Sequence, residues 1–92
     1  MPRKKAECLI SFDPKITYFK PRGVPLCSLE VMALSAEEIE ALRLKGMEEL
    51  DQISCAKKMN ISQSTFHRIL QSAIKKVTKA LINGMAIEII NE

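Results

Sequence analysis

The longest regular pattern of apolar positions lies in the second half of the chain. After Ser62, apolar side chains return at intervals of three and four residues, and neither Gly nor Pro interrupts them before Asn83-Gly84. This spacing is typical of an amphipathic helix that packs along one side. The sequence therefore predicts a helix of about 22 residues, capped by Ser62 and ended by Gly84. Its predicted buried stripe contains Phe66, Ile69, Leu70, Ala73, Ile74, Val77, Ala80 and Leu81.

Two shorter helices are expected before it. Ser35-Ala36-Glu37-Glu38 has the spacing of a capping box, and Ile39 and Leu42 follow at helical intervals. That helix should end near Gly46, because glycine caps a helix C-terminus without steric cost. Asp51 is the expected cap of the next helix, which places Cys55, Ala56 and Met59 on one face.

Short apolar runs flank the helical part. Cys8–Phe12 ends at the turn signal Asp13-Pro14, and Ala86–Ile90 follows Gly84. We expect these two runs to pair as a two-stranded sheet, within one chain or between two, because a lone strand has no partner. Residues 16–25 should form an extended connection with Tyr18 and Phe19 directed inward. Residues 26–34 are ambiguous between a short helix and a loop.

The predicted fold is therefore mainly α, with a minor two-stranded β element made by the chain ends. The 92 residues form one structural domain. Within it, residues 1–34 are expected to hold a basic arm, a short strand and an extended segment. Residues 35–84 form the helical part, and residues 85–92 the last strand.

Residues 52–70 meet the requirements of a helix-turn-helix. Such a motif needs a small residue where the helices cross, a residue that accepts a left-handed backbone at the turn, an apolar plug, a cap and apolar positions in the second helix. In this chain these are Ala56, Asn60, Ile61, Ser62, Phe66 and Ile69. The alternative is an ordinary helical hairpin that binds nothing.

Charge is distributed unevenly along the chain. Residues 54–84 contain six Lys or Arg and no Asp or Glu, whereas residues 32–53 contain two basic and six acidic residues. A stretch without carboxylates is a local positive field that attracts polyanions. The alternative is a solvated lysine face.

Composition excludes several other functions. The chain offers no spacing of nucleophile, base and acid, no glycine-rich phosphate loop and no paired metal ligands, so an enzyme and a bound cofactor are not expected. Cys8, Cys27 and Cys55 are widely spaced, which favours free thiols in a reducing cytoplasm, with a redox sensor or an iron–sulfur ligand set as the alternative. Neither a secretory signal nor a membrane span is expected.

The chain resembles two groups of proteins. Glu38–Leu44, the predicted helix-turn-helix and Arg68–Leu81 are similar to region four of bacterial sigma factors, which reads the minus-thirty-five promoter element. The whole chain more closely resembles a family of small, uncharacterised prokaryotic proteins described as predicted DNA-binding proteins. The shared features are Pro2-Arg3, Tyr18-Phe19-Lys20-Pro21, Gly23-Val24-Pro25, Ala41-Leu42-Arg43-Leu44, Thr65-Phe66 and Arg68. The resemblance implies the fold and DNA binding, with Asn60 at a turn position that is often glycine.

A recognition helix that starts at Ser62 would place its first turns in the major groove. Gln63, His67, Arg68 and Gln71 are the candidates for base edges, with an ordinary surface histidine as the alternative for His67. Phosphate contacts are expected from Ser62, Ser64, Thr65, Lys57, Lys58, Lys75, Lys76, Lys79 and the N-terminal Arg3, Lys4 and Lys5.

The sequence thus predicts a sequence-specific binder of double-stranded DNA and a transcriptional regulator. The alternative is an adaptor that docks protein or RNA on the same basic helix. Glu37, Glu38 and Glu40 are either a contact for RNA polymerase or solvated first-turn glutamates, which the helix dipole favours. A homodimer is expected, because one recognition helix supplies little specific affinity.

Overall fold

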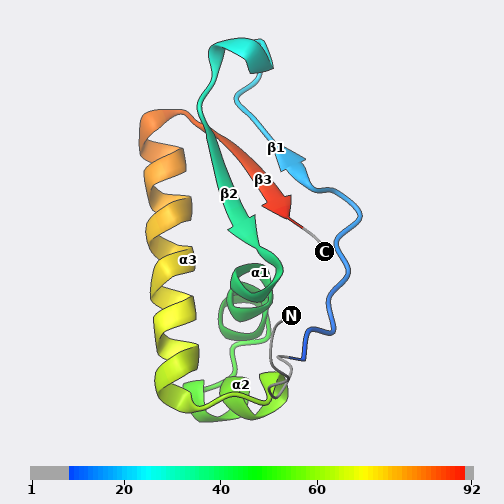
Figure 1. Cartoon of the computed structure of the whole chain (residues 1–92), viewed down its shortest axis with the longest axis vertical. Coiled ribbons are helices and arrows are strands. Elements are labelled where there is room, and N and C mark those ends of the chain that lie inside the picture. Colours follow the sequence, from blue (N-terminus) through cyan, green and yellow to red (C-terminus); the bar gives the residue numbers. More distant parts are fainter. Residues whose placement is uncertain (1–8, 91–92) are drawn as a thin grey trace, which may run out of the picture.

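Two strands precede the α-helices along the chain and one strand follows them, and all three strands form one small sheet. The computed structural model describes residues 9–90. Figure 1 shows the strands β1, β2 and β3 at one end, α1 beneath β2, α2 at the other end and the long α3 running past both. The elements are β1 (Tyr18–Phe19), a 3-10 turn (Leu26–Ser28), β2 (Val31–Ser35), α1 (Ala36–Leu42), a π-helical turn (Arg43–Met47), α2 (Gln52–Met59), α3 (Gln63–Asn83) and β3 (Ala86–Ile90).

The sheet has three strands in the order β1-β3-β2. β3 pairs antiparallel with β1, where Tyr18 lies opposite Glu88, and parallel with β2, where Val31 lies opposite Ala86. The predicted strand at Ala86–Ile90 is confirmed, but its predicted pairing with Leu9–Phe12 is wrong. The stretch that was ambiguous between helix and loop supplies the 3-10 turn and the longest partner strand.

The segment Leu9–Phe12 is held by the helices and not by the sheet. The Leu9 N–H donates to the Met59 carbonyl oxygen at the end of α2, 2.9 Å away. The Ser11 N–H donates to Oε2 of Glu40 on α1, 3.2 Å away. Because the Leu9 and Ser11 amides donate to α2 and α1, the apolar run lies along these two helices, and it does not form a strand.

Tyr18 and Phe19 are not directed inward, which corrects a second expectation. They retain 37% and 53% of their side-chain exposure. Both belong to a two-residue strand at the margin of the sheet, where nothing in residues 9–90 buries them. Phe19 only borders a shallow apolar groove of about 220 Å³ beside Leu81 and Met85.

The helix ends follow local signals in most places. Ser35 and Glu38 form the predicted capping box, and Gly84 ends α3 in a left-handed conformation. The first helical segment stops at Met47, near the predicted Gly46, but Gly46 is not its cap. The left-handed residue that redirects the chain there is Glu49, with φ 60°.

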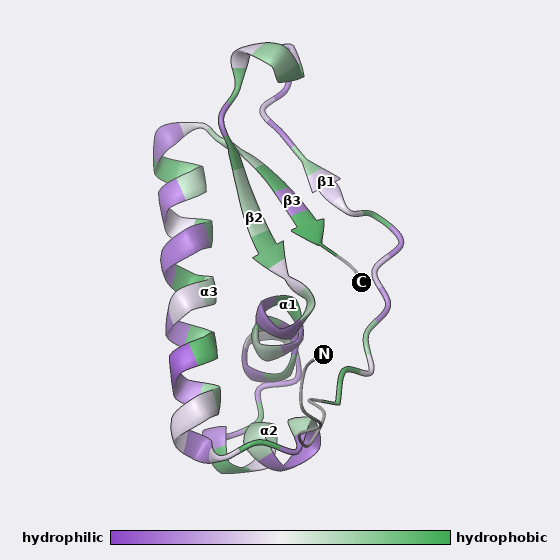
Figure 2. Cartoon of the chain, viewed as in Figure 1, coloured by the Kyte–Doolittle hydropathy of each residue, from purple (hydrophilic) through white to green (hydrophobic). Residues whose placement is uncertain are grey.

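Two groups of buried side chains lie along α3. One joins α1, α2 and the first half of α3, and contains Ala41, Leu44, Cys55, Ala56, Met59, Phe66 and Leu70. The other lies between the sheet and the second half of α3, and contains Leu34, Ala73, Ala80, Ala86 and Ile89. In Figure 2, β2 and β3 are coloured mostly as hydrophobic, whereas α3 alternates between hydrophobic and hydrophilic bands.

The predicted stripe of α3 is only partly buried. Phe66, Leu70, Ala73 and Ala80 are covered, but Ile74 is 42% exposed and Leu81 72% exposed. From the middle of α3 onward, the buried side chains are the small ones of Ala73 and Ala80. Within residues 9–90, no helix combines the length and the hydropathy that a membrane-spanning segment requires.

Candidate nucleic-acid interface

The corner between α2 and α3 depends on a left-handed residue. Asn60 caps α2 with φ 60° and ψ 45°, as its position in the sequence predicts. The Ile61 N–H donates to the Ala56 carbonyl oxygen at 3.0 Å, and the Ala56 side chain is buried against the core. Ile61 packs against the buried cluster that contains Ala56 and Phe66, so the core fixes the direction in which α3 leaves the corner.

The start of α3 is capped by hydroxyl groups. Ser62 Oγ accepts from the Thr65 backbone N–H at 3.1 Å and donates to Thr65 Oγ1 at 2.9 Å. Ser64 Oγ lies 3.3 Å from the same Ser62 atom. Two of the three predicted phosphate-binding hydroxyls, those of Ser62 and Thr65, therefore also serve the cap.

Four predicted base-reading side chains are exposed on the first three turns of α3: Gln63, His67, Arg68 and Gln71. His67 Nδ1 lies 3.3 Å from Gln52 Oε1, which places this ring against α2. Arg68 Nη2 lies 3.5 Å from Thr65 Oγ1, which is a long contact and the one its guanidinium makes within the described residues 9–90. Gln63, Arg68 and Gln71 are thus the most available of the four.

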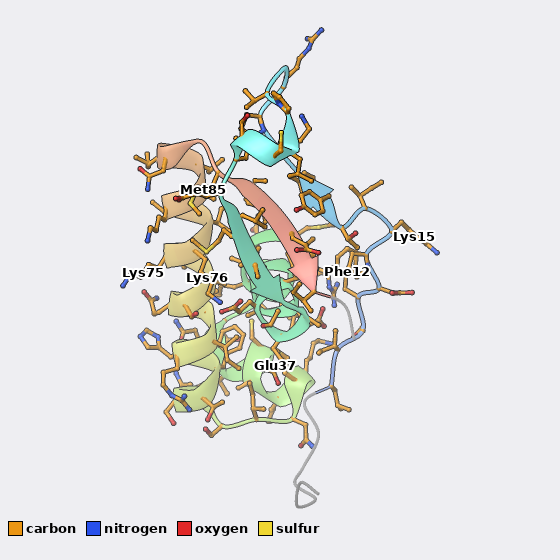
Figure 3. All side chains as sticks on the ribbon, turned by 45° about the horizontal axis from the view of Figure 1, so that its top comes forward. Phe12, Lys15, Glu37, Lys75, Lys76 and Met85 are labelled. Atoms are coloured by element: carbon orange, nitrogen blue, oxygen red, sulfur yellow. The ribbon has the colours of Figure 1, made fainter. Side chains whose placement is uncertain are left out.

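The predicted phosphate-binding lysines divide into two kinds. Lys57, Lys58, Lys75 and Lys79 are exposed, whereas Lys76 is half-buried. Lys76 Nζ lies 3.1 Å from the Glu38 carboxylate on α1. Figure 3 shows Lys75 extending away from the molecule and Lys76 on the side facing the strands and α1. Arg3, Lys4, Lys5 and Cys8 lie outside the described residues.

Glu38 is a buried carboxylate, contrary to the expectation of a solvated first-turn glutamate. It is only 7% exposed. Ser72 Oγ donates to it at 2.6 Å and the Ser35 N–H at 2.9 Å, in addition to Lys76. Burial raises the pKa of Glu38, but these hydrogen bonds outweigh it, and the pKa lies below its ordinary value.

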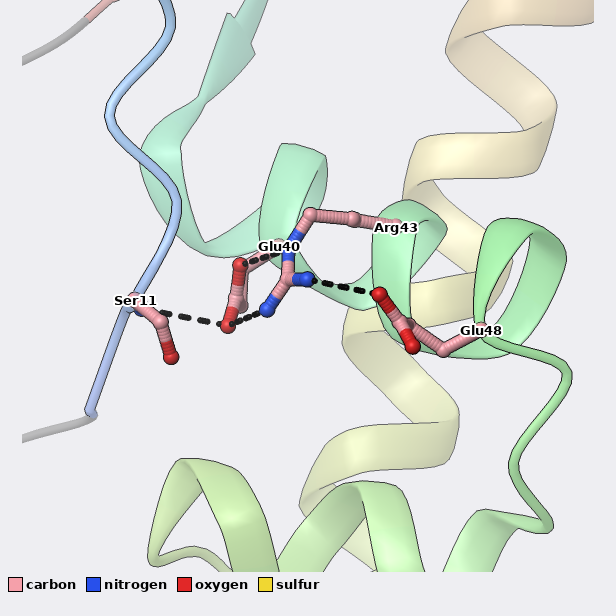
Figure 4. A network of polar contacts seen from close by, with 4 residues as sticks. All are labelled: Ser11, Glu40, Arg43 and Glu48. Carbon is pink, nitrogen blue, oxygen red and sulfur yellow. Dashed lines mark hydrogen bonds and ion pairs between the residues drawn. The ribbon is translucent and has the colours of Figure 1, made fainter.

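Glu40 is the second buried carboxylate, 1% exposed. Both of its oxygens lie 3.0 Å from the Arg43 guanidinium, which also reaches Glu48 at 3.2 Å (Figure 4). Burial raises the pKa of Glu40, but the hydrogen bonds from Arg43 and Ser11 lower it by more. The pKa of Glu40 therefore lies below its ordinary value. Of the three glutamates expected to be solvated, only Glu37 is exposed.

Only some of the contacts made by Glu38 and Glu40 could be predicted from the sequence. Arg43 follows Glu40 by three residues, a spacing that favours an ion pair on one helix. The contacts of Glu38 with Ser72 and Lys76 join positions 34 and 38 residues apart in the chain, so no local pattern indicates them.

The cysteines do not form a cluster in the part of the chain that the structure describes. Cys27 is exposed and Cys55 is buried, and both are free thiols. Burial raises the pKa of the Cys55 thiol, which disfavours the reactive thiolate. Among residues 9–90 no three His, Cys, Asp or Glu side chains lie close enough to hold a metal ion.

Comparison with known proteins places this chain among uncharacterised prokaryotic proteins. It is 52% identical over 80 residues to a UPF0251 protein of Desulforudis audaxviator, a match that covers 87% of this chain and 52% of that protein. A UPF0251 protein of Caldanaerobacter subterraneus is 47% identical over 89 residues, which cover 97% of this chain and 75% of the relative. A third, from Moorella thermoacetica, is 51% identical over 89 residues, 97% of this chain and 60% of its own length.

The chain thus spans about half to three quarters of the length of these relatives. No solved structure matches it significantly. The family model described as "Protein of unknown function DUF134" matches residues 1–92, the whole chain. This chain therefore belongs to the DUF134 family.

Proposed function

We propose that this protein binds double-stranded DNA in a sequence-specific manner and regulates transcription. In this proposal α2 and α3 form a helix-turn-helix, and α3 is the recognition helix. The observation that carries the proposal is the exposed start of α3, where Gln63, Arg68 and Gln71 project with hydrogen-bonding groups left for a ligand. No carboxylate occurs from residue 54 to residue 84 to oppose a polyanion.

The backbone geometry supports this proposal. The left-handed Asn60 and the buried Ala56 let α2 and α3 approach closely, which leaves the N-terminus of α3 at the outer end of the molecule (Figure 1). An α-helix fits the major groove, and a helix N-terminus favours phosphate. The resemblance of this part of the chain to sigma region four points to the same use.

The side chains suggest distinct roles. Glutamine suits adenine and arginine suits guanine, so Gln63, Gln71 and Arg68 are assigned to base edges. Lys75 and Lys79, further along α3, and Lys57 and Lys58 on α2 are assigned to phosphates. Lys76 is assigned to the fold, since its ammonium group is paired with Glu38.

Selection of duplexes from a random library with the purified protein tests the proposal and supplies the preferred site. On that site, Arg68→Ala should cost about 1–3 kcal/mol in binding, and much less on a scrambled duplex. Lys75→Ala should weaken binding to both duplexes alike and lower the log–log salt slope by about one. Equal losses for both variants on both duplexes would show that α3 is only an electrostatic face.

A second candidate function is an adaptor that docks a protein or an RNA on α3. The exposed apolar residues Leu81 and Ile82, which retain 72% and 79% of their exposure, favour this candidate. Salt titrations against duplex DNA, single-stranded RNA and heparin distinguish the two. Preference for one duplex sequence supports DNA recognition, and equal affinity for all three polyanions contradicts it.

A further inference from the structure

The two edges of the sheet differ in how they are protected. The β1 edge is two residues long and is followed by Lys20 and Pro21. A short strand, a lysine and a proline are the features by which proteins block the addition of a further strand. The β2 edge is five residues long, Val-Met-Ala-Leu-Ser, and contains neither a charge nor a proline. Only β2 therefore has an edge suited to pairing.

The register shows which backbone groups of β2 are left for a partner. Val31 lies opposite Ala86, and the Ala86 N–H donates to the Glu30 carbonyl oxygen at 2.9 Å. In a parallel ladder this arrangement directs the backbone groups of Val31 and Ala33 away from β3. The N–H of Ser35, two positions further, is used by Glu38. For Val31 and Ala33, no residue in the described range 9–90 supplies a partner, and both residues are exposed.

We propose that β2 is a homodimer interface, where it pairs antiparallel with β2 of a second copy of this chain. The two-fold axis passes at Met32, so that Val31 of each copy lies opposite Ala33 of the other. Each such pair exchanges two backbone hydrogen bonds. The result is a continuous six-stranded sheet in which β2 is no longer an edge, and the same surface serves both copies.

Charge favours this surface over the exposed face of α3. No side chain from Val31 to Ala36 is ionisable, so two copies meet there without like charges. The antiparallel direction also sends the two Glu30 side chains to opposite ends of the pair. Pairing through Ile74 and Leu81 would instead bring Lys75 and Lys79 of both helices together, with no carboxylate on α3 to compensate.

Apolar surface next to the edge adds to the interface. Val31 is 42% exposed and Leu26, in the turn before β2, is 44% exposed. Figure 1 shows this part of the sheet at the end of the molecule opposite α2. Dimerisation through β2 therefore leaves the start of α3 free, and it does not depend on the proposed DNA binding.

The test is the mass of the full chain in solution, measured by sedimentation equilibrium without nucleic acid. The expected result is a concentration-dependent species of twice 10.4 kDa. Ala33→Pro removes only an outward N–H from each copy, so two of the four proposed hydrogen bonds are lost. It should raise the dissociation constant of the dimer by about tenfold or more. A monomer at high micromolar concentration for the unchanged chain would overturn the proposal.

Ala36→Pro is the matched control. It makes the same chemical change three residues away, at the first position of α1, where proline is tolerated. This variant should remain a dimer. Ala33→Lys is a second test in case the proline variant misfolds. It keeps the backbone N–H but places like charges across the interface, so it should also weaken the dimer. Circular dichroism shows whether each variant is folded.

Leu81→Lys tests the competing helical interface. It should leave the dimer intact, and a monomeric Leu81→Lys beside dimeric β2 variants would refute the proposal. Amide exchange supplies an independent measurement. The amides of Val31 and Ala33 should become protected as the concentration of the unchanged chain rises, and exchange that does not depend on concentration would contradict pairing at β2.

Discussion

Glu38 and Glu40 show how one short helix can bury two carboxylates. Each lies in α1, and each is paired with a cation and accepts a hydrogen bond from a donor in another segment. Arg43 also lies 6.0 Å from the centre of the Phe12 ring, which adds a cation–π contact to the same network. Because the partners come from the N-terminal segment and from α3, the two carboxylates join parts of the chain that are far apart in sequence.

We expect the free energy of unfolding to fall at acid pH. The native pKa of Glu38 and of Glu40 lies below the ordinary value of 4.5 that applies to the unfolded chain. The unfolded state therefore takes up protons first as the pH drops below that value. The stabilisation is complete above it and is lost as the pH falls through the lowered native pKa. Urea denaturation from about pH 7 to about pH 3 measures this. Glu38→Gln should flatten the profile, whereas Glu37→Gln, on an exposed side chain, should leave it unchanged.

Two adjacent lysines should respond differently to the same substitution. Lys76→Gln removes the cation beside buried Glu38 and should lower the free energy of unfolding by about 1–3 kcal/mol. Lys75→Gln removes an exposed charge and should change stability by less than about 0.5 kcal/mol. Thermal melts at neutral pH check both. Equal effects would show that the Lys76–Glu38 pair contributes nothing to folding.

The turn between α2 and α3 permits a test on a single backbone angle. Asn60 has φ 60°, a conformation that asparagine tolerates and that alanine adopts only with strain. Asn60→Ala should cost about 1 kcal/mol of stability, and Asn60→Gly should cost less than that, because glycine has no Cβ to strain. Chemical denaturation of both variants is the measurement. A glycine variant that is less stable than the alanine variant would mean that the asparagine side chain, and not the backbone, stabilises this turn.

The helices could be predicted from sequence because their signals are local. The capping box at Ser35, the left-handed Asn60, the cap at Ser62 and the stop at Gly84 all act within a few residues. The sheet could not be predicted in the same way. The partners of β3 lie more than 50 positions earlier in the chain, and β3 pairs with β1 on one side and with β2 on the other.

Exposure was the other property that the pattern could not supply. A spacing of three and four residues indicates which side chains share a face of α3, but the width of the layer that covers the face decides which are buried. The sheet covers Ala73 and Ala80 and leaves Ile74 and Leu81 in solvent. For the candidate interface, the types and positions of the residues could be predicted from sequence. That Lys76 pairs with Glu38, and so is not available to a phosphate, could be seen only from the tertiary structure.

The whole molecule is organised along α3. Its first half completes the core with α1 and α2, and its second half supports the sheet. The proposed recognition surface at the start of α3 and the proposed dimer edge on β2 therefore lie at different ends of the molecule, and α3 runs between them (Figure 1). A substitution at one end should affect the other end only by changing the stability of the fold that α3 holds together.

The last prediction concerns that connection. Ile89 in β3 is 6% exposed and belongs to the buried group under the sheet, whereas the next residue, Ile90, is 37% exposed. Ile89→Ala should lower the free energy of unfolding by about 2–4 kcal/mol, and the matched Ile90→Ala by clearly less. Because α3 contributes to both buried groups, the free energy that protects the amides from exchange should fall equally at Phe66, near the corner, and at Leu34, in β2. Denaturant-dependent amide exchange at both residues measures this. If Phe66 kept its protection in Ile89→Ala while Leu34 lost it, the two ends would unfold separately and α3 would not couple them.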